Sequence, residues 1–196
     1  MDVVKHYDTL IEEENDPYRD PLPLREYMEK WDGSKFIASM HLSGKEKVLE
    51  IGVGTGRVAS KVIPLCCSFD GIDISPKTIE RAQNNLSEYK NKHLICANFL
   101  DYYFDETYDV IYSTLTLQHF EDKQAFISKA STILNNDGIL CLSLDKNRSD
   151  YIDMGNRKLR VFPDDPTIIE KCIVNAGLKL QEKYEVEFAT IIVCSK

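Results

Sequence analysis

Three glycines on alternate positions, Gly52, Gly54 and Gly56, follow a short apolar run that contains Glu50. A turn without side chains lets a nucleotide-like ligand lie against the backbone beside a helix N-terminus. The pattern therefore predicts a ligand-binding turn between a strand and a helix. The alternative is a tight turn that only allows the strand and the helix to pack closely.

Asp73 stands at the end of a second strand-like run, about twenty residues after the first glycine. At that position in nucleotide-binding folds, a carboxylate accepts hydrogen bonds from the ribose hydroxyls. It can instead cap the next helix, but Ser75 and Pro76 already offer an N-cap and a first helical residue. We therefore expect Asp73 to be available to a ligand.

The segment 48–56, VLEIGVGTG, together with Asp73 resembles the first two motifs of class I S-adenosylmethionine-dependent methyltransferases. The resemblance continues through 108–120, which is similar to the fourth strand of that family and the loop after it. It also covers 134–140, which is similar to the passage into the fifth strand. Dinucleotide-binding proteins have GxGxxG instead of GxGxG, so an NAD or nucleotide-sugar enzyme is a distant alternative.

Strand-like runs alternate with amphipathic helical segments along most of the chain, which predicts an α/β fold with a mostly parallel sheet covered on both faces. The resemblance implies a Rossmann-like sheet of seven strands in the order 3-2-1-4-5-7-6, with the last strand antiparallel. We expect strands near 47–51, 67–72, 92–96, 108–113, 138–144, 179–187 and 188–195.

The length of 196 residues suits one domain. We expect a single methyltransferase domain over 1–196, with an N-terminal helical cap over 1–44 and the core over 45–196. No apolar run is long enough to span a membrane and the first residues do not resemble a signal peptide, so a cytoplasmic location is expected. The net charge of −8 disfavours nucleic acid as a partner, and the six cysteines form no CxxC motif, so no metal is expected.

The resemblance also implies which residues contact S-adenosylmethionine. Glu50 would orient its amino group and the backbone near 113–115 would touch its methionine part. Asn98 replaces the acidic residue that commonly binds adenine, although its amide oxygen can still accept a hydrogen bond. Phe99 either flanks the adenine or fills the core. The expected cofactor-binding residues are Glu50, Gly52, Gly54, Gly56, Asp73, Ile74, Asn98, Phe99, Ser113, Thr114 and Leu115.

Methyl transfer from a sulfonium mainly requires alignment of the reacting atoms, so no catalytic residue is assigned. An acceptor that loses a proton would need a base, and His119 is the candidate because it follows the fourth expected strand. A capping or packing role is its alternative. The sequence therefore predicts a methyltransferase for an unidentified small-molecule acceptor; the rival is a non-enzymatic sensor or partner subunit that binds the same cofactor or its demethylated product.

Two regions are candidates for binding the acceptor. The N-terminal aromatic residues either form a lid or dock the helices against each other, and the polar span 145–165 is longer than a connection requires. Arg157, Lys158 and Arg160 in that span raise the hypothesis of an anionic acceptor. The oligomeric state is left open by the sequence.

Overall fold

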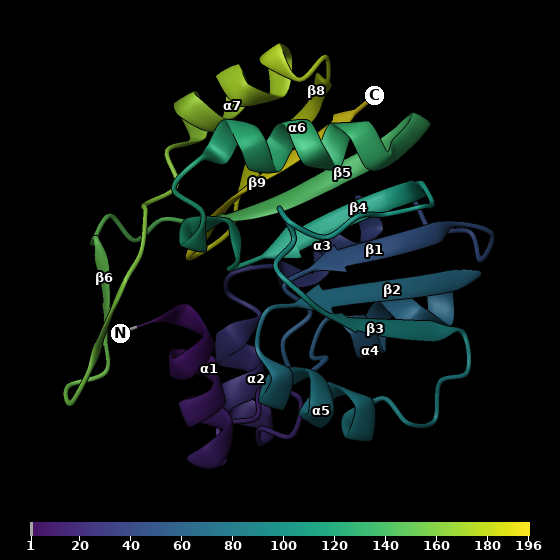
Figure 1. Ribbon diagram of the computed structural model, residues 1–196. Helices are drawn as coiled ribbons and strands as arrows, with labels where there is room; N and C mark the ends of the chain where they lie inside the picture. The colour runs from purple at the N-terminus through teal and green to yellow at the C-terminus, as the bar shows by residue number, and fades with distance from the viewer. Residues whose placement is uncertain (1) are drawn as a thin grey trace.

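The computed structural model describes residues 2–196 and is built around a seven-stranded sheet (Figure 1). The strand order is β3-β2-β1-β4-β5-β9-β8, and β9 runs antiparallel to both of its neighbours. The predicted order is thereby confirmed, since β8 and β9 are the sixth and seventh strands of this sheet. The strands are β1 (Lys47–Ile51), β2 (Ser68–Asp73), β3 (Lys92–Cys96), β4 (Tyr108–Thr114), β5 (Leu134–Asp145), β8 (Lys179–Glu185) and β9 (Ala189–Ser195).

Helices precede the sheet and connect its strands. Two of the connecting helices begin with an N-cap followed by proline: Ser75 accepts from the Thr78 N–H (3.1 Å), and Asp165 accepts from the Thr167 N–H (2.8 Å). The α-helices are α1 (Val3–Glu12), α2 (Leu22–Met28), α3 (Gly33–Ala38), α4 (Ala59–Val62), α5 (Pro76–Asn85), α6 (Lys123–Ile133) and α7 (Pro166–Asn175), with short 3₁₀ turns η1 (Ile63–Leu65) and η2 (Leu117–His119).

Successive residues of each strand point to opposite faces of the sheet. In β1, Val48 packs with residues of α3, α4 and α5, whereas the adjacent Leu49 packs with residues of α6 and α7. Both faces are therefore buried, as expected of a mainly parallel sheet. This burial fixes the strand ends, and with them the loops at the carboxyl edge where ligands bind in such folds.

The span 145–165 contains an unpredicted hairpin, formed by β6 (Tyr151–Asp153) and β7 (Lys158–Arg160). Figure 1 shows it reaching away from the main sheet toward the N-terminal helix α1. The Arg157 guanidinium donates two hydrogen bonds to the Glu13 carboxylate just beyond α1 (2.6 and 2.5 Å). The hairpin and the N-terminal region are thus joined by a bidentate ion pair.

The N-terminal region is also attached to α5 by polar contacts. Asp8 Oδ1 accepts from the Ser75 hydroxyl (2.7 Å) and from the Lys77 N–H (3.2 Å) at the start of α5. At the other end of α5, Asn85 donates to the buried Asp16 carboxylate (3.1 Å). These contacts hold α1 over the carboxyl edge of the sheet. Among the described residues, no helix is both long and apolar enough for a membrane span.

Candidate functional site

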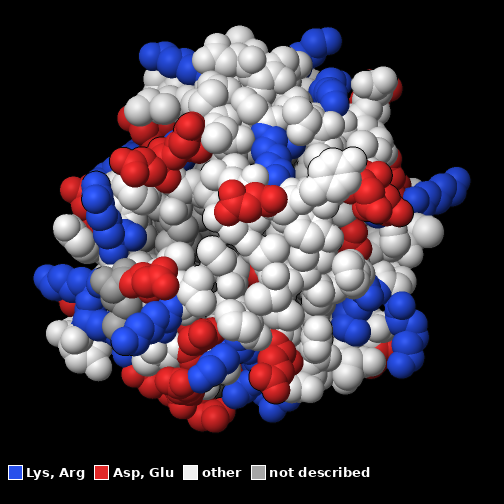
Figure 2. Space-filling model, viewed as in Figure 1, with Lys and Arg blue, Asp and Glu red and all other residues white. Residues whose placement is uncertain are grey.

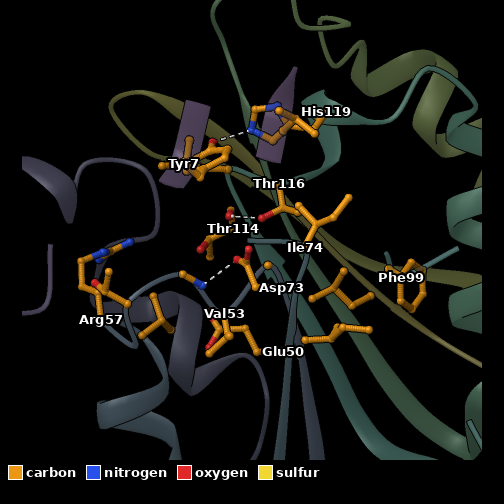
Figure 3. A pocket seen from close by; sticks show the side chains of 18 of the residues that line it. Tyr7, Glu50, Val53, Arg57, Asp73, Ile74, Phe99, Thr114, Thr116 and His119 are labelled. Atoms are coloured by element: carbon orange, nitrogen blue, oxygen red, sulfur yellow. Dashed lines mark hydrogen bonds between the residues drawn. The ribbon is translucent and has the colours of Figure 1, made fainter. Parts of the chain in front are cut away.

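A cavity of about 390 Å³ lies at the carboxyl ends of β1, β2 and β4 and is covered by the N-terminal region. Cavities of this size accommodate small ligands. Figure 3 shows the side chains that line it. The structure brings most of the expected site residues together here: Glu50, Gly52, Gly54, Asp73, Ile74, Asn98, Phe99, Thr114, Leu115 and His119 all contribute to the lining.

Each of the three positions in the glycine turn requires glycine for a different physical reason. Gly54 has a φ of +55°, and a Cβ added to it would enter open space, so its bare backbone faces the cavity. A Cβ on Gly52 would collide with the Thr116 side chain, and one on Gly56 would meet Leu86 at 2.9 Å. Gly56 is not part of the lining. It allows the turn to pack closely against Leu86 at the end of α5, and a contact between Gly56 and the ligand stays a prediction.

Asp73 ends β2 beneath the glycine turn. Its Oδ2 accepts from the Gly54 N–H (3.0 Å) and its Oδ1 accepts from the Ser75 N–H (3.0 Å). The carboxylate is therefore not free of partners, although Ser75 does provide the α5 N-cap as expected. Burial raises the pKa of Asp73, and the two backbone hydrogen bonds oppose that shift. Each oxygen keeps a second lone pair with which to accept a ligand hydroxyl.

Glu50 is buried at the end of β1, where its Oε2 accepts a hydrogen bond from the Tyr112 hydroxyl (2.7 Å). Burial raises the pKa of Glu50 to about 8, although the Tyr112 hydrogen bond and nearby Arg57 oppose the shift. A carboxyl group with a raised pKa ionises more readily when a cation lies beside it. It is therefore suited to an ammonium group.

Asn98 and Phe99 follow β3 at the side of the cavity near α6. Asn98 Oδ1 accepts from the Leu100 N–H (3.0 Å), which uses one of its acceptor positions in a local turn. Phe99 packs against Phe104, Phe120 and Phe126 and also lines the cavity. Both proposed roles of Phe99, core filling and flanking a planar ligand, are thus compatible with its position.

The end of β4 turns sharply into the next loop. Leu115 has a positive φ of 56°, an unusual conformation for a leucine. Thr114 and Leu115 line the cavity, but Ser113 does not: its hydroxyl donates to the Ile51 carbonyl (2.9 Å) between β4 and β1. The Ser113 side chain thus bridges two strands inside the sheet, and the expected contact of the backbone near 113–115 with the cofactor stays a prediction.

His119 lies in the cavity wall opposite the glycine turn, and its Nε2 is 2.7 Å from the Tyr7 hydroxyl of α1. Burial lowers the pKa of His119 to about 4, so the ring is neutral near pH 7. The same physical cause raises the pKa of Tyr7 above its usual range. This pair joins the N-terminal helix to the loop after β4.

The N-terminal aromatic residues divide between the two expected roles. Tyr7 lines the cavity, as a lid residue would. Tyr27 and Trp31 instead pack against Phe188, so they dock the N-terminal helices on the core. Tyr7 was among the possible lid residues, but its contact with His119 was not predicted, because the fold and not the spacing brings the two together.

Arg57 directly follows the glycine turn and was not predicted to be a site residue. Its guanidinium Nη2 lies 2.7 Å from Asp32 Oδ2, and both side chains are almost completely buried. Its Nη1 has no hydrogen-bond partner among the described residues. The only sequence signal was its position next to Gly56, because Asp32 is distant in the chain.

The three basic residues of the hairpin region do not line the cavity. Arg157 is paired with Glu13, Lys158 with Asp153 (2.9 Å), and Arg160 lies over the Phe162 ring. The structure therefore gives these side chains partners within the protein and does not place them where an acceptor could meet the cofactor.

Comparison with known proteins agrees with this geometry. Residues 49–140 match the family model described as "Methyltransferase domain". This match supports the resemblance to the class I S-adenosylmethionine-dependent methyltransferases over that segment. An uncharacterized methyltransferase from Staphylococcus carnosus is 28% identical over 97% of this chain and 94% of its own.

Other methyltransferases match a shorter part. Malonyl-[acyl-carrier protein] O-methyltransferase 1 from Ilyobacter polytropus is 27% identical over 62% of this chain, which spans about half of that relative's length (47%). The solved DhpI–SAH complex superimposes with a TM-score of 0.77 at 16% identity, covering 97% of this chain and 93% of that one. A methyltransferase structure from Clostridium acetobutylicum has a TM-score of 0.69 at 15% identity, covering 97% and 96%. These structural similarities concern the fold.

The methyltransferase cofactor fits the residues in this cavity. The Gly54 backbone offers a surface that a side chain would fill, and Asp73 keeps acceptor capacity beside it. Glu50 and Arg57 add one acidic and one basic group to the lining. A ligand with ribose hydroxyls and an amino acid end would find a matching group for each part.

Proposed function

We propose that this protein is an S-adenosylmethionine-dependent methyltransferase for a small-molecule acceptor. The observation that carries the proposal is the order of groups along one cavity. Figure 3 shows Phe99 and Arg57 at opposite sides, with Asp73 between them. This order matches adenine, ribose and methionine in the cofactor. When bound, S-adenosylmethionine would supply an electrophilic methyl group, while the protein holds and orients it.

The acceptor side of the cavity would be formed by the N-terminal region. Val3, Tyr7, Pro17 and Met28 line it together with His119 and Phe120. Within the described lining, Arg57 is the single permanently charged cation, so an anionic acceptor finds no dedicated partner on this side. We therefore favour a small acceptor that is uncharged where it meets these residues.

Relatives do not decide which acceptor is used. They include proteins named for malonyl-[acyl-carrier protein], demethylmenaquinone, ubiquinone biosynthesis and rRNA adenine. Figure 2 shows acidic and basic side chains of the described residues interspersed over the face that it displays, instead of separated by sign. Such a face does not favour a nucleic acid acceptor, because phosphate binding relies on gathered basic residues.

His119 is better suited to positioning than to proton abstraction in this proposal. Its Nε2 is occupied by the Tyr7 hydroxyl, and a ring with a pKa of about 4 is a weak base. We infer that the His119–Tyr7 pair keeps α1 closed over the cavity. Proton removal from the acceptor would then be left to the acceptor's own acidity or to water.

Incubation of the purified protein with methyl-labelled S-adenosylmethionine and a metabolite extract tests the proposal. An enzyme gives a labelled small molecule and S-adenosylhomocysteine in equal amounts. The Gly54→Val variant, whose side chain would enter the cavity, should give neither. Tight cofactor binding without product across fractionated extracts would instead favour a sensor or a partner subunit.

A further inference from the structure

Asn85, the last residue of α5, connects the glycine turn to the N-terminal region through a single side chain. Its Nδ2 donates to the Thr55 carbonyl in the turn (3.0 Å) and to the Asp16 carboxylate between α1 and α2 (3.1 Å to each oxygen). Its Oδ1 accepts from Arg19 Nε (2.8 Å). Asn85 and Asp16 are both buried, so water does not compete for the hydrogen bonds that hold the two segments together.

The N-terminal segment also contacts the glycine turn directly. The Tyr18 N–H lies 3.3 Å from Thr55 Oγ1 and 3.2 Å from Asp16 Oδ1. Pro17 lies between Asp16 and Tyr18 and lines the acceptor side of the cavity. Thr55 lines the same cavity next to Gly54. The acceptor wall and the cofactor turn are distant in sequence, yet the same few polar groups hold both.

Methyl transfer requires the acceptor to approach the methyl group from one direction, so the acceptor wall has to keep a fixed position relative to the bound cofactor. Asn85 is placed to meet this requirement, because it bonds one backbone group of the turn and the residue that precedes Pro17. A movement of the turn is therefore transmitted to the wall through one side chain.

We infer that Asn85 is a positioning residue that keeps the acceptor wall at Pro17 aligned with the cofactor turn at Thr55. Cofactor binding and closure of the N-terminal region then favour each other. This coupling rests on the proposed function and deepens it, because it links the cofactor and acceptor sides of one cavity. Coupling of this kind is reciprocal: if the ligand strengthens closure, loss of the closing contacts weakens ligand binding by the same factor.

Calorimetry with S-adenosylhomocysteine on the full chain measures the coupling. For Asn85→Ala, we expect the affinity to fall about five- to fiftyfold, within the range usual for coupled sites. Asn91→Ala is the matched control, because Asn91 Nδ2 likewise donates to backbone carbonyls of another segment, at Ile63 (3.2 Å) and Cys66 (3.1 Å), and lies outside the described cavity lining. The control should keep its affinity. Unchanged affinity in Asn85→Ala, or equal losses in both variants, would overturn the inference.

A double-mutant cycle shows whether Asn85 and Asp16 act as one link. Asp16→Ala removes the same link from the side of the N-terminal region. The double variant should lose less affinity than the product of the two single losses, because both changes break one connection. A loss equal to that product would mean that the two residues act separately, which contradicts the inference.

Hydrogen exchange distinguishes positioning from simple stabilisation, because it reports local opening of each segment. In the wild type, S-adenosylhomocysteine should slow amide exchange several-fold in the glycine turn and also in residues 13–20. In ligand-saturated Asn85→Ala, the slowing should persist in the turn and be largely lost in residues 13–20. Equal slowing of residues 13–20 in both proteins would overturn the inference.

The wild type alone provides a test that does not depend on the folding of a variant. Slowing confined to its glycine turn would overturn the coupling and leave the proposed function standing. Absence of any S-adenosylhomocysteine binding by the wild type would instead overturn the proposed function itself.

Discussion

Gly54 is the residue at which backbone conformation and ligand space coincide. Its φ is positive, a Cβ added to it would meet no atom within 4 Å, and the residue lines the cavity. Gly155, in the hairpin between β6 and β7, also has a positive φ and open space on the Cβ side, but it lies outside the cavity lining. A side chain at either glycine would strain the backbone, but only one at Gly54 would also take up space in the cavity. Comparing the two substitutions therefore distinguishes the effect of backbone strain from the effect of excluding the ligand.

For Gly54→Ala, we expect the free energy of unfolding to fall by about 1 kcal/mol, the cost of a left-handed conformation for a residue with a Cβ. The affinity for S-adenosylhomocysteine should fall by at least about tenfold, because the added methyl group occupies ligand space. Gly155→Ala should show a comparable loss of stability and unchanged affinity. Urea unfolding and calorimetry measure both quantities, and equal affinities for the two variants would refute the placement of Gly54.

Glu50 should make stability depend on pH. Its pKa in the folded protein is about 8, above the usual value of 4.5, because burial disfavours the ionised form. The folded state therefore binds the proton more tightly than the unfolded chain does. As pH rises from about 4.5 to about 8, Glu50 should lower the free energy of unfolding by a few kcal/mol.

The variant Glu50→Gln isolates this effect because it keeps the shape of the side chain and cannot ionise. Relative to the wild type, it should become progressively more stable as pH rises through that window. Urea denaturation at about pH 5 and about pH 8 gives the comparison. Parallel pH profiles of the two proteins would show that Glu50 does not ionise in the folded state with a raised pKa.

At the scale of elements, α1 is the component that closes the cavity, and it does so through side chains that meet distant parts of the chain. Tyr7 contacts His119, and Asp8 accepts two hydrogen bonds at the start of α5. Because α1 contributes Val3 and Tyr7 to the cavity lining, we expect ligand release to involve movement of α1. The strength of these contacts should thus affect the rate of ligand dissociation.

Replacing Asp8 with alanine tests this link. We expect the free energy of unfolding to fall by about 1 kcal/mol, as for other lost capping interactions, and S-adenosylhomocysteine to dissociate several times faster. Asp165→Ala removes a cap of the same kind from α7, outside the cavity lining, and should leave the dissociation rate unchanged. Stopped-flow dissociation measurements compare the two; the same rate for both variants would mean that α1 does not limit release.

The elements also show which features local sequence could predict. The glycine turn, Asp73 and the Ser75 cap belong to one contiguous strand–turn–helix pattern, so spacing alone brings them together. The pairs Tyr7–His119 and Arg57–Asp32 depend on where the N-terminal helices dock, which spacing does not encode. Strands β6 and β7 have only three residues each, too few for their alternation to stand out in the sequence, so the hairpin was not predicted.

At the scale of the whole molecule, the order of the main sheet was predictable because alternating strands and helices, combined with the family resemblance, leave few arrangements. The side chain at each strand end was less predictable. Ser113 and Thr114 are adjacent, yet one bridges β4 to β1 and the other reaches the cavity. Because successive side chains of a strand point to opposite faces, a shift of one residue along the strand would interchange these two positions.

The central claim is that one cavity binds the adenine, ribose and amino acid parts of the cofactor in a fixed order. A crystal structure with S-adenosylhomocysteine tests it most directly. We predict adenine beside Phe99, ribose hydroxyls on Asp73, and the amino acid end between Glu50 and Arg57. Density for the ligand in the reverse orientation, at another site, or nowhere at saturating concentration would contradict it.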